Sequence, residues 1–200
     1  MINGAANATD EERVPLIEAV QRLVRGGWDE LESSIVTYGA PICVKGTRSI
    51  VRCHFLRSDA LGVPRLKALA QQLANQIVNY CIPRTEIQKV GELSLDRQIP
   101  EITRMTNQAA RLFTQTQVNT GEGAELLLYA LLEKELQIPQ ILSKMSLKTS
   151  TEVQYHGADG VHAKLLDNGD LAVYWGEAKL YESVQGAMTD CMDSIAPYLL

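Results

Sequence analysis

The sequence predicts an α+β protein: an N-terminal α+β region followed by a core of one helix, three strands and a second helix. Apolar residues recur every three or four positions over residues 124–136, and residues 181–196 are also expected to be helical. Between them, β-branched and aromatic runs near residues 153–155, 160–166 and 171–180 predict three strands. With 200 residues, 46% apolar and 22% charged, the chain is long enough to bury a core and is not a disordered polypeptide.

The first hundred residues predict a mixture of helices and strands. Gly26 and Gly27 end the first helix, and Pro64 stands in the first turn of a later one. Residues 84–99 follow no clear period, so we place a domain boundary between residues 98 and 99. The expected elements are a helix over residues 16–24, a helical segment over 28–38, strands over 42–44 and 50–56, and helices over 64–83 and 102–113.

The net charge of −5 is unevenly distributed. Residues 151–200 hold eight acids and only two bases, whereas the first 150 residues sum to +1. An acidic segment repels phosphate, so contact of this quarter with nucleic acid requires a cation or another surface to supply the attraction.

The cysteines and the apolar runs favour a cytoplasmic protein. The four cysteines stand far apart, and no two have the C-x-x-C spacing of a thiolate metal site or redox pair. No apolar run is long enough to span a membrane, and the first thirty residues do not have the pattern of an export signal. We therefore expect reduced thiols and no membrane contact.

Two acids and a lysine are the candidates for chemistry. Glu177 and Lys179 project from the same face of the strand expected over residues 171–180, and Asp159 directly precedes the neighbouring strand. A two-residue Asn168-Gly169 turn would pair residues whose numbers sum to 337 and would separate Asp159 from Glu177. A three-residue loop with Gly169 in the left-handed conformation makes the sum 336 and places them opposite each other.

Opposed carboxylates in this register could bind one Mg²⁺, because directly opposed Cβ atoms lie about 5 Å apart. Glu125 lies on the apolar stripe of the helix over residues 124–136, where an unpaired carboxylate is costly and favours a nearby cation. The alternative for Glu125 is that it complements the helix dipole from the first turn.

Other residues near these acids have simpler interpretations. Lys144 and Lys148 either contact phosphates or belong to a solvated loop. Strand alternation turns His162 away from the face of Asp159, which indicates a structural role. Tyr174 and Trp175 are expected to be core residues.

Together these elements resemble the PD-(D/E)xK nuclease core, with Ala158 at the position of the proline in that name. More specifically, the sequence resembles the HamA family, the nuclease subunits of Hachiman anti-phage defence systems, and the likeness is strongest over residues 120–196. The segments that carry it are Gly123-Ala124-Glu125-Leu126-Leu127-Leu128-Tyr129, Ser143-Lys144-Met145-Ser146-Leu147-Lys148-Thr149, His156-Gly157-Ala158-Asp159-Gly160-Val161-His162 and Gly176-Glu177-Ala178-Lys179-Leu180-Tyr181.

This resemblance implies a metal-dependent DNA nuclease that associates with a HamB-like superfamily 2 helicase. Asp159 and Glu177 would hold Mg²⁺, for which Mn²⁺ substitutes, with Glu125 in or near the metal shell and Lys179 as the catalytic cation. Residues 1–98 would bind the partner and residues 99–200 would form the nuclease domain. The family core continues to a further strand, so truncation at Leu200 or completion by another chain is expected.

Two further interpretations stay open. The chain could be a catalytically inactive nuclease-fold interaction module that docks a helicase. Alternatively, the enzyme could act on RNA or on a particular DNA structure, since no side chain is assigned to reading bases. The acidic C-terminal quarter predicts weak DNA binding by the isolated chain in either case.

Overall fold

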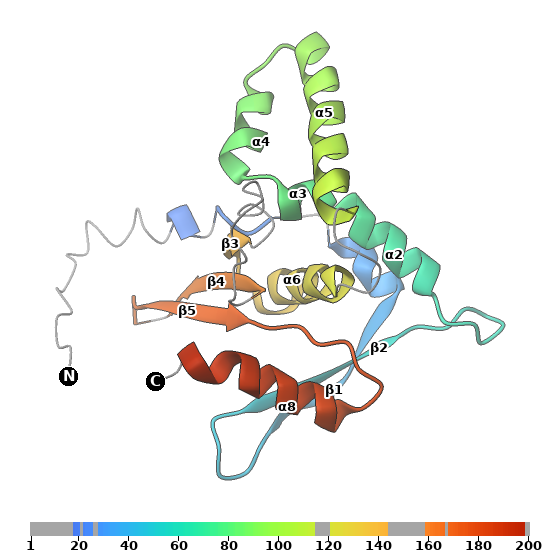
Figure 1. Ribbon diagram of the computed structural model, residues 1–200, viewed down its shortest axis with the longest axis vertical. Coiled ribbons are helices and arrows are strands. Elements are labelled where there is room, and N and C mark those ends of the chain that lie inside the picture. The colour runs from blue at the N-terminus through green and yellow to red at the C-terminus, as the bar shows by residue number, and fades with distance from the viewer. Residues whose placement is uncertain are drawn as a thin grey trace. The chain divides into compact units, whose positions relative to one another are not determined.

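The computed structural model describes residues 18–20, 22–25, 28–114, 121–143, 159–166 and 168–198 (Figure 1). The chain divides into two compact units, one of Gly26–Gln76 and the other of Met1–Arg25 with Ile77–Leu200. Helices and strands occur in both, which confirms the α+β class. None of the helices among these residues is both long and apolar enough to cross a bilayer.

The unit of Gly26–Gln76 is built on a two-stranded antiparallel hairpin. It contains a 3₁₀ helix η1 (Asp29–Ser33), strands β1 (Ile35–Cys43) and β2 (Ile50–Leu56), and helix α2 (Leu66–Asn75). The predicted strand pair is confirmed. The helical segment predicted over residues 28–38 is wrong beyond η1, because the β-branched run that starts at Ile35 favours an extended chain.

The single helix predicted over residues 64–83 is interrupted at Gln76. Helix α2 ends at Asn75 and helix α3 (Ile77–Cys81) begins two residues later. The Gln76 N–H donates to the carbonyl of Leu73 at 2.9 Å, a tighter i to i+3 bond, and Gln76 has a φ of −97° and a ψ of 0°. The two compact units divide at this position.

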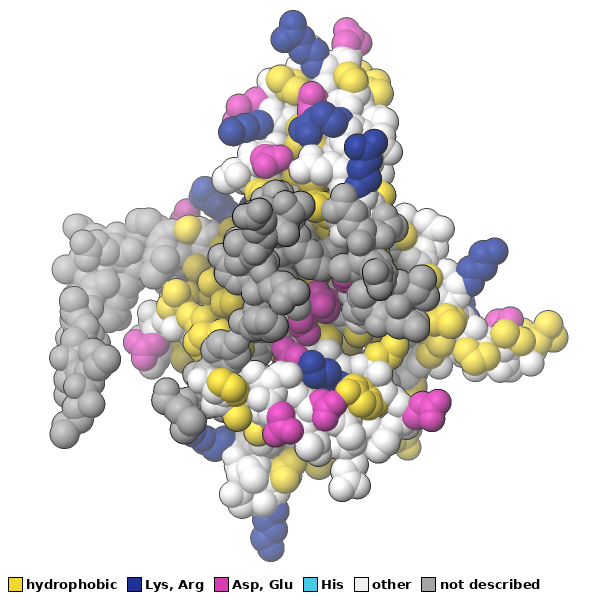
Figure 2. Space-filling model, in the orientation of Figure 1, with side chains coloured by type: hydrophobic (Ala, Val, Ile, Leu, Met, Phe, Trp, Pro, Cys, Tyr) yellow, Lys and Arg dark blue, Asp and Glu magenta, His cyan; other side chains and the backbone are white. Residues whose placement is uncertain are grey.

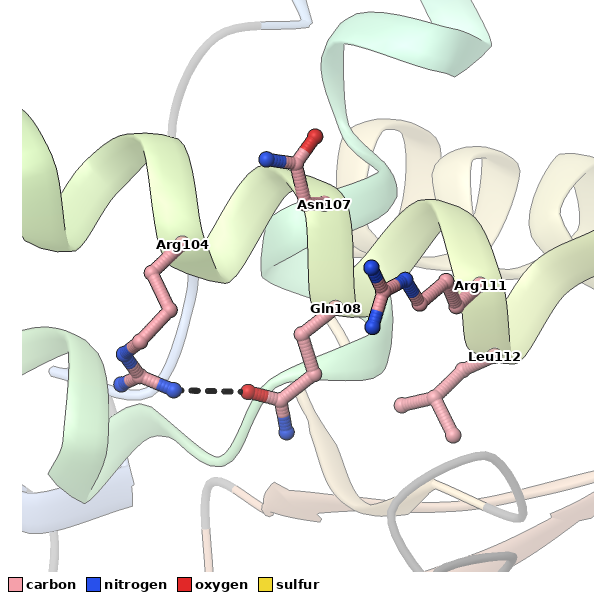
Figure 3. A pocket seen from close by; sticks show the side chains of 5 residues that line it. All are labelled: Arg104, Asn107, Gln108, Arg111 and Leu112. Atoms are coloured by element: carbon pink, nitrogen blue, oxygen red, sulfur yellow. Dashed lines mark hydrogen bonds between the residues drawn. The ribbon is translucent and has the colours of Figure 1, made fainter.

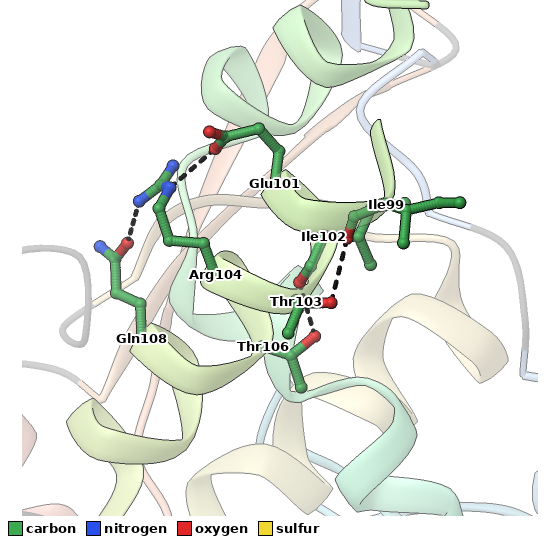
Figure 4. A network of polar contacts seen from close by, with 7 residues as sticks. All are labelled: Ile99, Glu101, Ile102, Thr103, Arg104, Thr106 and Gln108. Atoms are coloured by element: carbon green, nitrogen blue, oxygen red, sulfur yellow. Dashed lines mark hydrogen bonds and ion pairs between the residues drawn. The ribbon is translucent and has the colours of Figure 1, made fainter. Parts of the chain in front are cut away.

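Two further helices follow α3, namely α4 (Arg84–Gly91) and α5 (Leu95–Thr114). Helix α5 is longer than the predicted range of 102–113, and the boundary placed between residues 98 and 99 lies inside it. Pro100 lies inside this helix. The hydroxyls of Thr103 and Thr106, on its exposed face, donate to the carbonyls four residues earlier (Figure 4). Met105 and Ala109 are buried on the opposite side, and α5 packs against α3.

Helix α6 (Glu122–Leu136) and a three-stranded antiparallel sheet form the second half of this unit. The sheet order is β3 (Gln140–Ser143), β4 (Gly160–Leu165) and β5 (Leu171–Gly176), and helices α8 (Val184–Ile195) and η2 (Ala196–Tyr198) follow. Strand β3 was not predicted. The strand predicted near residues 153–155 lies outside the described residues.

Strand β5 differs from the prediction in two respects. It ends at Gly176 instead of continuing to residue 180, so Glu177 and Lys179 belong to the irregular segment that follows it. Tyr174 and Trp175, expected in the core, are 37% and 49% exposed. The face of β5 that carries Trp175 is therefore open to solvent.

The register of the β4–β5 hairpin confirms the three-residue loop. Gly160 pairs with Gly176 and Leu165 with Leu171, so the paired numbers sum to 336. The Leu166 N–H donates to the Asp170 carbonyl at 2.8 Å, and Gly169 has a φ of +85°, in the left-handed region. This register carries residue 159 and residue 177 to the same end of the hairpin.

His162 is a structural residue, as predicted. Its side chain is 1% exposed, and Nδ1 lies 3.3 Å from the carbonyl oxygen of Ile138. Burial lowers the pKa of His162, while the bond to Ile138 opposes this shift. The imidazole lies against Gly160 and Gly176, on the sheet face that Leu128 of α6 contacts.

Candidate metal-binding site at the end of the β4–β5 hairpin

Asp159 stands directly before β4 and is tied to the end of β5 by two hydrogen bonds. Its N–H donates to the Gly176 carbonyl at 2.9 Å, and its Oδ2 accepts the N–H of Ala178 at 2.9 Å. The residue is 8% exposed. A carboxylate held by a backbone N–H in such surroundings has a defined orientation. One backbone bond and one side-chain bond thus place Asp159 beside the Glu177-Ala178-Lys179 segment.

Glu177 and Lys179 form an ion pair, although β5 has already ended. Lys179 Nζ donates to Glu177 Oε1 at 2.5 Å, with the Glu177 side chain 7% exposed and the Lys179 side chain 26% exposed. The hydrogen bond to Glu177 raises the pKa of Lys179, burial opposes this, and the charges of Glu177 and Asp159 raise it further. The ammonium is therefore protonated at neutral pH and lies within the field of both carboxylates.

Helix α8 closes one side of this group. The Cys191 thiol donates to the Glu177 carbonyl at 3.9 Å, and burial followed by the Glu177 charge raises the pKa of Cys191. The thiol is therefore a neutral packing residue. All four cysteines are free thiols.

Glu125, the third predicted acid, stands in the first turn of α6. Its Oε2 accepts the hydroxyl hydrogen of Tyr80, from α3, at 3.2 Å. Burial raises the pKa of Tyr80, and the charges of Glu125 and Asp159 raise it further. The hydrogen bond thus joins Tyr80 of α3 to the carboxylate of Glu125 on α6.

These side chains form a cluster with an excess of negative charge. The Ala178 N–H and the ion pair with Lys179 bring two carboxylates, on Asp159 and Glu177, beside a single ammonium. Figure 2 shows acidic side chains near the centre of the visible face beside a basic one. Carboxylate oxygens are the donors that Mg²⁺ and Mn²⁺ prefer, so the donor chemistry fits a hard divalent cation.

The geometry limits the number of direct ligands. In the described part of the chain, no group of three or more His, Cys, Asp and Glu side chains is arranged to hold a metal ion. Mg²⁺ is commonly bound through one or two carboxylates, with water and substrate phosphates completing the shell. Asp159 and Glu177 are therefore the two candidate ligands here, and the carboxylate of Glu125 accepts the hydrogen bond of Tyr80.

The predicted phosphate contacts, Lys144 and Lys148, lie outside the described residues. A separate cavity of about 450 Å³ lies along α5 and is lined by Arg104, Asn107, Gln108, Arg111 and Leu112 (Figure 3). Glu101 and Gln108 hold the Arg104 guanidinium at 2.7 and 3.0 Å (Figure 4). The Arg111 guanidinium has no ion-pair partner among the residues that the structure describes.

Sequence reasoning missed two neighbours of the candidate site, Tyr80 and Cys191. Both lie on apolar helical patterns, where a tyrosine or a cysteine is ordinarily a core residue. Nothing in the spacing links Tyr80 to Glu125, which is 45 positions away. Only the packing of α3 against α6 brings them together.

The protein has an α+β fold in which the end of an antiparallel hairpin brings two carboxylates and a lysine together. The sequence model of the HamA family matches residues 35–200, and the chain belongs to the HamA family. Membership in this family identifies it as a component of Hachiman anti-phage defence. No curated protein and no solved structure matches the chain.

Proposed function

We propose that this protein is a divalent-metal-dependent DNA nuclease that works in a defence complex with a HamB-like helicase. The observation that carries the proposal is the junction of Asp159 with the Glu177-Lys179 pair through the Ala178 N–H. Family membership and the excess negative charge of the cluster support it.

Each side chain has a role that follows from its position. Asp159 and Glu177 would hold Mg²⁺ or Mn²⁺, and Glu125 would complete the metal shell or stand just outside it. A bound Mg²⁺ supplies charge neutralisation at the scissile phosphate and lowers the pKa of a water molecule. Lys179, a compact cation beside these acids, would orient the attacking water and stabilise the negative charge that develops on the phosphate.

DNA attraction must come from outside the acidic C-terminal quarter. The arginines along α5 are cations of the right sign, and Arg111 is exposed. With these few cations the isolated chain would bind DNA weakly. The helicase partner would deliver the DNA strand, and it would restrain cleavage until the strand is delivered. RNA or a particular DNA structure would use the same hydrolytic site.

Cleavage assays on the full chain test this proposal. We expect Mn²⁺- or Mg²⁺-dependent cleavage of DNA that is lost on chelation and in Asp159→Ala and Lys179→Ala. Competition with RNA and with single-stranded and double-stranded DNA would define the substrate class. Equal cleavage by the wild type and both variants would assign the activity to a contaminant and remove the proposal.

One observation favours a second candidate, a catalytically inactive module that docks a helicase. It is the lack of a three-ligand group among the described residues. This module would co-purify with its helicase partner and show no heat of Mn²⁺ binding by calorimetry. Saturable Mn²⁺ binding that requires Asp159 would exclude it.

A further inference from the structure

A second cavity is bordered by the residues just before Gly26, by helices α3 and α4 and by strand β3. Its volume is about 270 Å³, and the described residues that line it all belong to the unit of Met1–Arg25 with Ile77–Leu200. No acidic side chain is among those lining residues, whereas two arginines, Arg25 and Arg84, are. The apolar part of the lining consists of Leu23, Ile82, Pro83, Ile141 and Leu142.

The two arginines are held differently. Arg84 Nη1 donates to the carbonyl of Leu23 at 2.8 Å, which fixes this guanidinium at the cavity. Arg25 also lines the cavity, but its Nη1 is buried and has no hydrogen-bond partner in the described part of the chain. A buried donor without an acceptor costs free energy, so the Arg25 guanidinium favours an anionic acceptor that the protein itself does not supply.

Positive charge at this cavity exceeds negative charge. The buried carboxylate of Glu133 accepts the backbone N–H of Arg25 at 3.1 Å, and it balances one of the two guanidinium charges. Helix α4 also begins at the cavity, with Thr85 of its first turn in the lining, and no side chain caps this end of the helix. The start of a helix carries a partial positive charge, which adds to the attraction for an anion.

We propose that this cavity binds a phosphate monoester carried on an organic group of nucleotide size, as in a free nucleotide or the 5′ end of a DNA strand. Guanidinium groups match the spacing of phosphate oxygens, and the start of a helix favours a phosphate. The cavity has room beyond a phosphate group, and its apolar side chains suit the less polar part of such a ligand. The inference does not require a metal ion at Asp159 and Glu177, so it stands apart from the proposed function.

Calorimetric titration of the full chain in EDTA tests the inference. Adenosine monophosphate is the probe, at pH 7.5, where its phosphate is largely doubly ionised. We expect it to bind at least about 10-fold more tightly than adenosine, because hydrogen bonds to charged groups are the strong ones. It should also bind more tightly than inorganic phosphate, which leaves the apolar lining uncovered. No binding of the nucleotide, or an affinity equal to that of either fragment, would overturn the inference.

Variants of the cavity assign the binding to its arginines. Arg25→Gln should weaken binding of the nucleotide at least about 10-fold and leave adenosine binding unchanged. Arg25→Lys keeps the charge but loses the planar fork, so an intermediate affinity is expected. Arg22→Gln is the matched control, because the Arg22 side chain is 77% exposed and pairs with Glu18 at 2.9 Å. Wild-type affinity in Arg25→Gln would contradict the proposal.

Thermal unfolding without ligand separates binding from a structural role of Arg25. If Arg25 only balances the charge of Glu133, then Arg25→Gln lowers the unfolding midpoint and keeps the wild-type nucleotide affinity, and the inference fails. Thr85→Lys covers the case in which Arg25→Gln does not fold, since Thr85 is exposed and lines the cavity. The added cation should strengthen nucleotide binding, and an unchanged affinity would count against the site.

Oligonucleotides in EDTA identify the source of the phosphate. A short single-stranded DNA is titrated with and without a 5′-phosphate. Tighter binding of the phosphorylated strand that is lost in Arg25→Gln assigns the cavity to a DNA end. Equal affinities for the two strands, together with nucleotide binding that depends on Arg25, assign it to a free nucleotide.

Discussion

Asp159 Oδ2 accepts a hydrogen bond from the backbone N–H of Ala178, the residue between Glu177 and Lys179, at 2.9 Å. This contact lies just beyond the last ladder pair of the hairpin, Gly160 with Gly176. It explains how three side chains stay together after β5 has ended. Asp159 therefore has two roles, as acceptor of this hydrogen bond and as carrier of a negative charge. An uncharged acceptor at the same position would keep the first role and lose the second.

Asp159→Asn tests the charge separately from the contact. The amide oxygen can still accept the Ala178 N–H, so we expect the fold to survive. Loss of a metal-binding carboxylate should lower DNA cleavage at least about 100-fold and weaken Mn²⁺ binding. Asp193→Asn, an exposed acid of α8, is the matched control and should cleave as the wild type does.

Lys179→Gln separates catalysis from metal binding. Lys179 donates to Glu177 but has no lone pair for a metal when protonated, so its loss should lower the turnover number by about 10²- to 10³-fold and leave Mn²⁺ bound. Lys164→Gln, an exposed lysine of β4, serves as the control. Wild-type turnover by Lys179→Gln would show that this ammonium only balances charge.

A side chain added at Gly160, at the start of β4, would press against two neighbouring side chains, of which the buried His162 has little freedom to move. A Cβ there would lie 2.9 Å from Gln140 Nε2 and 3.0 Å from His162 Nε2. We expect Gly160→Ala to lower the free energy of unfolding by about 1 to 3 kcal/mol, measured by urea denaturation. Gly123→Ala, in α6 with nothing within 4 Å, should instead raise it by up to about 1 kcal/mol.

His162 makes stability depend on pH. Burial lowers its folded pKa, so below the ordinary value of about 6.5 the unfolded chain binds a proton that the folded chain does not. The contribution of His162 to the free energy of unfolding is thus complete above about pH 6.5. It is lost as the pH falls below that value, by at most about 1.4 kcal/mol per pH unit. Urea unfolding between pH 7.5 and 5.5 should show a smaller loss for His162→Gln than for the wild type. Parallel curves would contradict this.

The elements with strong local signals could be predicted from the sequence. The spacing of apolar residues predicted helix α6. The Asn168-Gly169 pair left two possible hairpin registers, one with a two-residue loop and one with a three-residue loop, and the structure has the three-residue loop. Strand β3 is only four residues long and follows Pro139, so its alternation is too short to detect. The break between helices α2 and α3 at Gln76 could not be predicted, because the helical spacing of apolar residues continues through this position.

The candidate site was predictable where its members share one hairpin, and not where they come from different elements. Asp159, Glu177 and Lys179 are related by strand register, which depends on sequence and turn chemistry. The link between Tyr80 and Glu125 depends on how α3 packs against α6, which no local pattern encodes. The end of β5 at Gly176 was also missed, yet the Ala178 contact keeps Glu177 and Lys179 in place.

The central claim is that Asp159 and Glu177 hold one divalent ion. Anomalous diffraction from crystals of the full chain grown with MnCl₂ tests it most directly. The account predicts a manganese peak at coordination distance, about 2.1 Å, from carboxylate oxygens of both residues, with Lys179 beside it and the peak absent in Asp159→Asn. A manganese peak that touches neither carboxylate, or none at saturating Mn²⁺, would contradict it.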